Sequence, residues 1–206
     1  MSDQNEDKGK MDRRMVKGDE TYQALILSAM EIISESGISR ISAAKLADRA
    51  KVSKSNVFHH FKTVQEIPEV VLNQMFSEMN LRMIFTDDKD LKENLIGFGE
   101  KYFKWSEVSK DKIRCFFSFY HEGLFQKRYH DILQVYLTES RRVLKKQIEL
   151  EGVPPTLAAT YAAQIIATLD GMGMQMLIDE DMQTYVGIWE LQIDMIMGQI
   201  VRDREN

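Results

Sequence analysis

The stretch Ile41–Lys62, ISAAKLADRAKVSKSNVFHHFK, predicts two short helices joined by a tight turn. Ser42 can cap the first helix, which we expect over residues 43–50. Ser53 can cap the second, which we expect over residues 54–60. A serine at this position accepts a hydrogen bond from a backbone N–H that has no partner inside the helix.

Both short helices have a small apolar face. Leu46, Ala47 and Ala50 lie on one side of the first helix. Val57 and Phe61, four residues apart, lie on one side of the second. Two short helices that cross through a turn of three or four residues form a helix-turn-helix.

The charge of this stretch fits contact with DNA. The whole chain has a net charge of −5, yet the stretch from Arg40 to Lys62 is strongly basic. Phosphate neutralisation by lysine and arginine provides most of the sequence-independent affinity for DNA. The acidic residue here is Asp48, and the basic residues are Arg40, Lys45, Arg49, Lys51, Lys54 and Lys62.

Length and composition place the chain among all-α globular proteins. A chain of 206 residues makes one large domain or two small ones, and helix formers and methionine dominate it while proline and glycine are few. It contains no apolar run of transmembrane length and no signal-peptide hydrophobic region, so we expect a cytoplasmic protein without a membrane partner. The single cysteine, Cys115, excludes an internal disulfide.

The pattern along the chain predicts three parts. Residues 1–17 are polar and lack a helical stripe, so we expect a disordered arm. Residues 18–66 contain a helix over about 19–36 and then the helix-turn-helix. Residues 67–206 form a helical body, with further helices expected from residue 64 or 68 to 85, and over residues 90–107, 112–125, 129–150, 156–178 and 182–202.

Pro68 leaves the start of the fourth helix open. Inside a helix, proline removes one hydrogen bond and clashes with a carbonyl one turn back, whereas it is well tolerated in the first turn. The helix therefore either begins at Pro68 or begins near Val64 and bends.

The N-terminal part resembles the TetR family of bacterial transcriptional repressors. The segment ILSAMEIISESG, followed by ISAAKLADRAKVSKSNVFHHFK, matches the family signature over roughly residues 22–67. Beyond it, the body matches in helix count, helix lengths and the sequence Leu169-Asp170-Gly171. The resemblance implies about nine helices, with a helix-turn-helix head on a body that binds an effector and dimerises.

Three residues depart from the family pattern. Lys51 stands where the turn usually has glycine, and a left-handed backbone there costs a non-glycine residue on the order of 1 kcal/mol. Phe58 replaces a tyrosine, so a phenolic contact to phosphate is lost. Val64 replaces a lysine that would lie near the phosphates.

Carried over by position, the resemblance implies roles in DNA binding. Asn56 is the strongest candidate for direct readout, because asparagine can bind adenine through two hydrogen bonds. The base-facing residues would be Ser55, Asn56 and His59, and the other interface residues would be Ser42, Ser53, Lys54, Phe58, His60 and Lys62.

The resemblance also implies a homodimer that binds a palindromic operator in duplex DNA and is released by a small effector. The two last helices have more apolar residues than one monomer needs, so we expect the interface at Ile165, Leu169, Met176, Trp189, Ile193, Ile196, Met197 and Ile200. The alternative is a monomer that buries these residues internally.

The body contains many aromatic and flexible apolar side chains, which predicts a site for an apolar or aromatic effector with a few placed polar groups. The expected residues are Met79, Met83, Phe98, Tyr102, Trp105, Phe116, Phe119, Tyr120, His121, Tyr136, Tyr161, Gln164, Asp170 and Met172. Each of these could instead be an ordinary core residue. An all-helical carrier or enzyme with a vestigial DNA-binding head is the alternative function.

Other motifs do not indicate catalysis, a metal site or a cofactor. His59 and His60 are adjacent and point in different directions on a helix, and His121 and His130 are nine residues apart, so neither pair has chelating spacing. The glycine pairs at 97 and 99 and at 171 and 173 lack the third glycine and the strand of a dinucleotide fingerprint. We therefore expect a regulator and not an enzyme.

Overall fold

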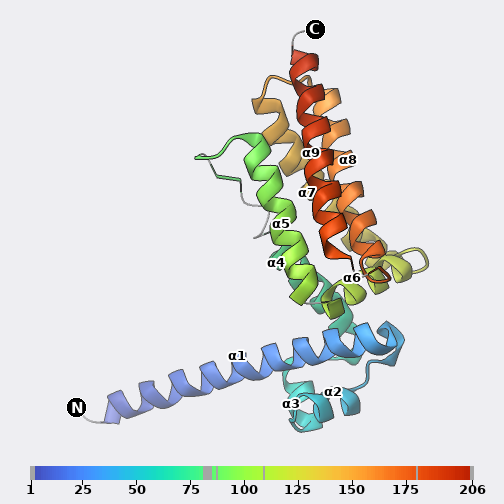
Figure 1. The fold of residues 1–206 in the computed structure, drawn as a ribbon. Coiled ribbons are helices and arrows are strands. Elements are labelled where there is room, and N and C mark those ends of the chain that lie inside the picture. Colours follow the sequence, from blue (N-terminus) through green and yellow to red (C-terminus); the bar gives the residue numbers. More distant parts are fainter. Residues whose placement is uncertain (1–2, 81–84, 87, 109, 180, 205–206) are drawn as a thin grey trace. The chain divides into compact units, whose positions relative to one another are not determined.

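The structure is a computed structural model that describes residues 3–80, 85–86, 88–108, 110–179 and 181–204. In these ranges the regular elements are the helices α1 to α9 and two 3-10 turns, so the all-α prediction is confirmed (Figure 1). The chain divides into two compact units, Met1–Leu72 and Asn73–Asn206. None of the helices in the described ranges is long and apolar enough to cross a membrane.

The first unit is built on a long helix that covers two short ones. Leu25, Ile26 and Ile33 of the long helix are fully buried, as are Leu46 and Val57 from the short helices. Gly37 ends the long helix with a φ of 84°, a conformation that favours glycine. The elements of this unit are α1 (Asp3–Ser36), a 3-10 turn (Ile38–Arg40), α2 (Ala43–Arg49), α3 (Lys54–His60) and a second 3-10 turn (Val64–Glu66).

Helix α1 begins earlier than the sequence pattern predicted. We expected a disordered arm over residues 1–17 and a helix from Asp19, but the helical backbone starts at Asp3. The added segment contains three lysines, two arginines and two methionines and no proline. These residues have high helix propensity, so the helix can extend although the segment has no apolar stripe to pack.

Helix α4 (Ile67–Asn80) carries the chain from the first unit to the second. Thr63 and Glu66 form a capping box in the turn before it, in which the Thr63 N–H donates to Glu66 Oε1 at 3.2 Å. The 3-10 turn Val64–Glu66 comes directly before α4, so Pro68 is the second residue of the α-helix, in the first turn, where proline is tolerated. The predicted extension of this helix toward Phe85 passes through residues 81–84, which lie outside the described ranges.

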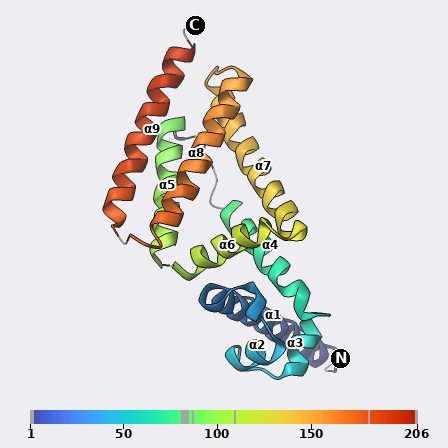
Figure 2. The same cartoon turned by 90° about the vertical axis from the view of Figure 1, so that its right-hand side faces the viewer.

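The second unit is a bundle of five long helices and the end of α4. Helix α7 packs along α8, α5 along α9, and α6 against α7. In Figure 2, α8 lies between α9 on the left and α7 on the right, and α5 lies behind α8 and α9. The helix ends differ from the predicted ones by a few residues, and the helices are α5 (Leu91–Val108), α6 (Lys110–Gly123), α7 (Lys127–Leu150), α8 (Pro155–Gln175) and α9 (Met182–Arg204).

The contact between α5 and α9 depends on a glycine. Trp189 of α9 is 1% exposed, and its indole N–H donates to the Leu95 carbonyl of α5 at 3.1 Å. A Cβ atom placed on Gly99 would lie 2.0 Å from the Trp189 Nε1 atom. The absence of a side chain at Gly99 therefore makes the space that the indole occupies.

We predict that Gly99→Ala destabilises the protein. The added methyl group overpacks a filled core, which typically costs about 1–3 kcal/mol. Gly97→Ala is the matched control, because it lies on the same helix and its Cβ would meet no atom within 4 Å. Alanine is the better helix former, so this control should be neutral or stabilising by up to about 1 kcal/mol. Urea unfolding of both variants measures the difference, and equal stabilities would contradict the assigned role of Gly99.

Candidate functional site

The two predicted serine caps hold α2 and α3 in the first unit. Ser42 Oγ accepts from the Lys45 N–H at 3.3 Å, and Ser53 Oγ accepts from the Asn56 N–H at 3.2 Å. Ser53 Oγ also lies 2.8 Å from Ser55 Oγ. Both caps were predicted correctly, while contact of these hydroxyls with DNA stays a prediction.

The turn between α2 and α3 contains the strained residue that the sequence indicated. Lys51 has a φ of 55°, the left-handed conformation that favours glycine. The turn closes through a hydrogen bond of 2.9 Å from the Val52 N–H to the Ala47 carbonyl. The Lys51 side chain is exposed, so strain in the backbone accompanies a positive charge on the surface.

Helix α3 presents one buried side and one open side. Val57 is fully buried and Phe61, the residue after the helix, is 3% exposed. Phe58 is 54% exposed, which is unusual for so large an apolar side chain. The remaining exposed residues of the helix are Lys54, Ser55, Asn56 and His59, with Lys62 just beyond it.

His60 differs from its neighbours, because it lies partly against α1. The ring of Tyr22 on α1 lies 5.9 Å from the His60 ring and stacks on the Phe61 ring at 5.6 Å. His60 is half-buried by this contact. We expected His60 only as a phosphate ligand; the structure also gives it a packing role between α3 and α1.

Arg49 was counted in the basic charge of the stretch, but the structure directs it elsewhere. Its guanidinium donates to both carboxylate oxygens of Glu35 on α1, at 2.7 and 2.6 Å, and lies 3.5 Å from Glu31. The hydrogen bond from Arg49 lowers the pKa of Glu35. Arg49 therefore joins α2 to α1, and the exposed basic residues around α3 are Arg40, Lys45, Lys51, Lys54 and Lys62.

A second candidate site lies among the helices of the body. The Tyr120 hydroxyl on α6 donates to Asp170 Oδ2 on α8 at 3.0 Å. Burial raises the pKa of the Asp170 carboxyl to about 6, although the Tyr120 hydrogen bond and Arg141 act in the opposite direction. Tyr102 of α5 and Tyr136 of α7 are close enough for Asp170 to raise the pKa of both hydroxyls further, after the effect of burial.

The structure brings together only part of the predicted effector site. Phe116, Tyr120 and Tyr136 form one ring cluster with Phe76 of α4, whose ring stacks on Tyr136 at 4.1 Å. Phe76 was not among the predicted effector residues, since nothing in the local sequence pattern shows which rings meet.

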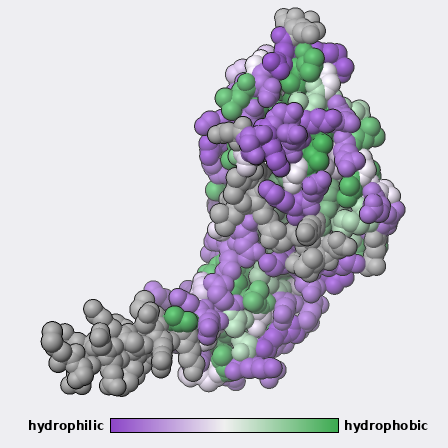
Figure 3. Space-filling view, turned by 60° about the vertical axis from the view of Figure 1, so that its left-hand side comes forward, coloured by the Kyte–Doolittle hydropathy of each residue, from purple (hydrophilic) through white to green (hydrophobic). Residues whose placement is uncertain are grey.

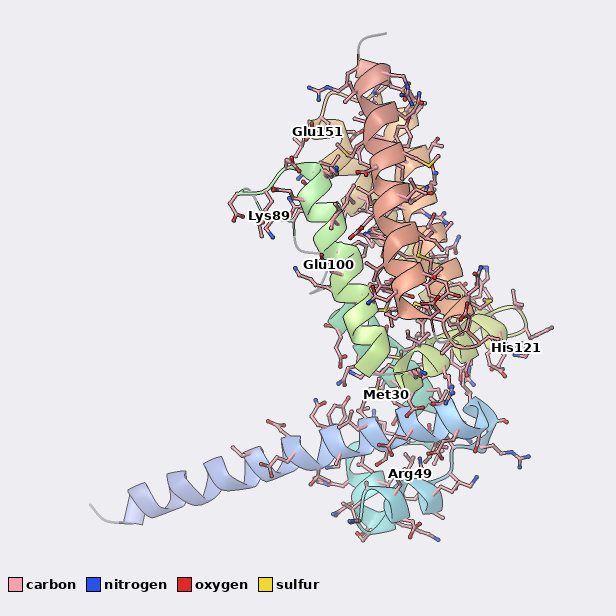
Figure 4. All side chains as sticks on the ribbon, viewed as in Figure 1. Met30, Arg49, Lys89, Glu100, His121 and Glu151 are labelled. Carbon is pink, nitrogen blue, oxygen red and sulfur yellow. The ribbon has the colours of Figure 1, made fainter. Side chains whose placement is uncertain are left out.

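Other predicted effector residues lie elsewhere. Tyr161 donates to Asp203 of α9, and Phe119 packs on Tyr129 at 5.5 Å. His121 projects outward from the end of α6 (Figure 4) and Gln164 is exposed. Met172 is buried, while Met79 and Phe98 are half-buried. Met83 and the Trp105 side chain lie outside what the structure describes.

The predicted interface residues are core residues of a single chain. Ile165 and Ile193 are fully buried, and Trp189 is 1% exposed without any partner chain. Leu169, Met176, Ile196 and Ile200 are also buried, and Met197 is packed on the same core. The expectation that these residues exceed the needs of one monomer was therefore wrong, because α5 and α7 cover them.

The opposite sides of α8 and α9 carry a different apolar set, which we call the outer stripe. Met174, Leu191 and Met195 are 56%, 63% and 62% exposed. The residues follow each other at alternating intervals of three and four, as in helices that pack on a partner helix. The outer stripe contains Leu157, Thr160, Gln164, Ala167, Gly171 and Met174 on α8, and Ile188, Leu191, Met195 and Gly198 on α9.

Comparison with known proteins agrees with this geometry. Residues 25–67 match the family described as bacterial regulatory proteins, tetR family. The chain is 24% identical over 173 residues to the nucleoid occlusion factor SlmA of Klebsiella pneumoniae, a match that covers 78% of this chain and 84% of the relative. The SlmA protein of Escherichia coli is 25% identical with the same coverage.

Solved structures share the fold. A transcriptional regulator from Rhodococcus superimposes with a TM-score of 0.75 at 22% identity, over 86% of this chain and 96% of that one. A TetR regulator from Legionella pneumophila gives a TM-score of 0.73 at 15% identity, over 84% and 95%. Fold and site thus define a helix-turn-helix protein with an all-helical body. Residues 25–67 carry the DNA-binding segment of the tetR family of bacterial regulatory proteins, and the chain shares the fold of the solved TetR regulators.

We predict that Lys51→Gly stabilises the protein. Glycine adopts the left-handed conformation without the steric cost of a side chain, which is on the order of 1 kcal/mol. Lys45→Gly is the contrasting control, because Lys45 lies inside α2 and glycine there should destabilise by about 1 kcal/mol. Thermal unfolding followed by circular dichroism measures both, and a destabilised Lys51→Gly protein would contradict the prediction.

Proposed function

We propose that this protein is a ligand-responsive repressor that binds a palindromic operator as a homodimer and is released by a small-molecule effector. The observation that carries the proposal is α3, a capped helix with a polar open side flanked by exposed lysines. A helix of this kind can enter the major groove, where side chains read base edges while neighbouring cations bind phosphates.

Within α3, Asn56 is the candidate for base readout. Its side chain is exposed, so the side-chain amide is accessible to a base. Its backbone N–H donates to Ser53 Oγ. Phe58 offers an exposed ring that can contact a thymine methyl group. Lys54 and Lys62 are placed at the two ends of the helix, where they can neutralise phosphates.

Dimerisation is proposed through the outer stripe of α8 and α9. TetR-family regulators typically dimerise, and two-fold symmetry matches a palindromic site. The outer stripe is uncharged and rich in apolar and small side chains, as expected where helices of two subunits approach closely. The face of the protein that Figure 3 shows is mostly hydrophilic.

The proposed effector acts on α4 through the ring cluster. Phe76 of α4 stacks on Tyr136, and Glu78 of α4 accepts from Lys112 of α6 at 2.8 Å, a pair that is only partly exposed. A ligand that displaces these rings therefore moves the end of the helix that leads to the DNA-binding unit. A coupling of about 1–3 kcal/mol is typical for such allostery.

A role in nucleoid occlusion is the second candidate, because the similarity to the nucleoid occlusion factor SlmA extends over 173 residues and thus well beyond the DNA-binding unit. Chromatin immunoprecipitation separates the two functions. A repressor occupies a few promoters, whereas a factor that acts for the whole nucleoid occupies sites distributed along the chromosome.

We predict that two substitutions in α3 affect DNA binding differently. Asn56→Ala should relax preference at one operator position, with a cost of about 1–3 kcal/mol for the preferred sequence. Lys54→Ala should weaken binding to all duplexes and reduce the salt dependence. Titration of a duplex selected from a random pool, at several salt concentrations, measures both effects. Lys89→Ala, at an exposed lysine of the second unit, is the control. Unchanged binding in both α3 variants would exclude α3 as the recognition helix.

We predict that Leu191→Glu separates the subunits without unfolding them. Leu191 is 63% exposed in one chain, so glutamate there is tolerated in a monomer but is buried and unpaired in the dimer. Val135→Glu on α7, where the valine is 64% exposed, is the matched control and should leave the dimer intact. Analytical ultracentrifugation gives the mass and circular dichroism the fold. A folded Leu191→Glu dimer would place the interface elsewhere.

A further inference from the structure

We propose that the effector is an organic cation, and that its positively charged nitrogen binds at the Asp170 carboxylate among tyrosine rings from α5, α6 and α7. This inference rests on the proposed effector-binding function and names the chemistry of that site.

Asp170 lies on α8 and is half-buried. Its oxygen Oδ2 accepts the Tyr120 hydroxyl at 3.0 Å. Tyr120 is also half-buried, so its side chain can shift when a ligand arrives.

The described residues form no ion pair with the Asp170 carboxylate. Arg141 acts on it only through longer-range attraction, and its own side chain is exposed. A carboxylate removed from water is costly unless it is paired, so a ligand cation would supply the missing partner.

Tyrosines from three helices lie near the Asp170 carboxylate. Tyr102 reaches α8 one turn beyond Asp170, where a Cβ atom on Gly173 would lie 2.0 Å from the Tyr102 hydroxyl oxygen. Gly173 therefore admits the tyrosine beside the carboxylate. Tyr120 and Tyr136 approach from α6 and α7, and Phe116 lies 4.9 and 6.0 Å from their rings. Aromatic faces attract cations, most strongly where water is excluded.

The net charge of the body agrees with this choice. From Ile67 to the C-terminus the chain has more acidic than basic residues, so a cation is attracted to this part of the protein and an anion is repelled. A neutral effector would leave the Asp170 carboxylate without an ion pair, and an anionic one would place like charges together.

The experiment compares two compounds of the same shape and different charge. Phenyltrimethylammonium is a cation, and tert-butylbenzene is its neutral isostere. Binding of each to the full-length wild-type protein without DNA is measured by quenching of tyrosine and tryptophan fluorescence at pH 7.5. We expect the wild type to bind the cation at least about tenfold more tightly than the isostere, in keeping with a desolvated cation–aromatic contact and a paired charge.

Asp170→Asn tests the carboxylate. Asparagine has nearly the same shape and its oxygen can still accept from Tyr120, so the substitution removes the charge and little else. The variant should bind both compounds equally. Asp203→Asn is the matched control, since Asp203 also accepts from a tyrosine, Tyr161, but in another part of the bundle. It should keep the preference of the wild type for the cation.

The pH dependence of the wild type is a second measurement that needs no variant. Among the described residues, the groups facing Asp170 are Tyr102, Tyr120, Tyr136 and Arg141. Burial is the main cause that raises the pKa of each tyrosine, so none of the three tyrosines titrates between pH 5 and 8. Since the pKa of Asp170 is about 6, affinity for the cation should be constant above pH 7 and fall as the carboxyl takes up a proton below pH 6. Affinity for the neutral isostere should not follow this curve.

Three results would overturn the inference: a wild type that binds the isostere as tightly as the cation, an Asp170→Asn variant that keeps the preference, and no binding of either compound at millimolar concentration. The proposed repressor function is tested separately by operator release. A cation that binds through Asp170 but leaves operator affinity unchanged supports the site and contradicts the repressor mechanism. A neutral effector that releases the operator supports the repressor mechanism and contradicts the proposed cation site.

Discussion

The structure depends first on the fact that a seven-residue helix is not stable on its own in water. Helix α3 has only seven residues, and so does α2. Both persist because α1 covers them: Val57 and Phe61 are buried, Tyr22 stacks on Phe61, and Arg49 forms an ion pair with Glu35. The orientation of the face of α3 that we propose for DNA binding is therefore set by the residues that hold its other face. Substitutions in α1 that disturb this contact would change DNA binding without touching the interface itself.

In the second unit, α8 and α9 likewise have one buried face and one exposed face. Ile165 and Ile193 face the interior that α5 and α7 complete, and the outer stripe faces away. The fit between α5 and α9 is close enough that Gly99 has to leave room for Trp189. A core packed to this density tolerates little displacement, so a ligand that enters it must move whole helices and not single side chains. Such a response is what a regulator needs if a small molecule is to affect a distant unit.

Asp170 is the exception to this pattern, because it is a carboxylate in a ring-lined interior without a basic partner in the described residues. A well-packed apolar residue at this place would serve stability better than a half-buried acid. Polar groups that lower stability are typical of functional sites, where binding compensates the cost. The Phe116 ring contacts the rings of both Tyr120 and Phe76, and this series of ring contacts connects Asp170 to α4 within the second unit.

The sequence by itself determined the helical class, the helix-turn-helix and both serine caps, because each is fixed by neighbours within a few residues. It also located α8 and α9 and their apolar character. Only the tertiary structure decided which apolar face lies inside, since both helices carry two apolar faces and periodicity cannot tell the one covered by α5 and α7 from the outer stripe. In the same way, Arg49 and Asp170 are charged residues in sequence. Only the packing of other helices places Arg49 in an ion pair and leaves Asp170 as a carboxylate that has no ion pair among the described residues.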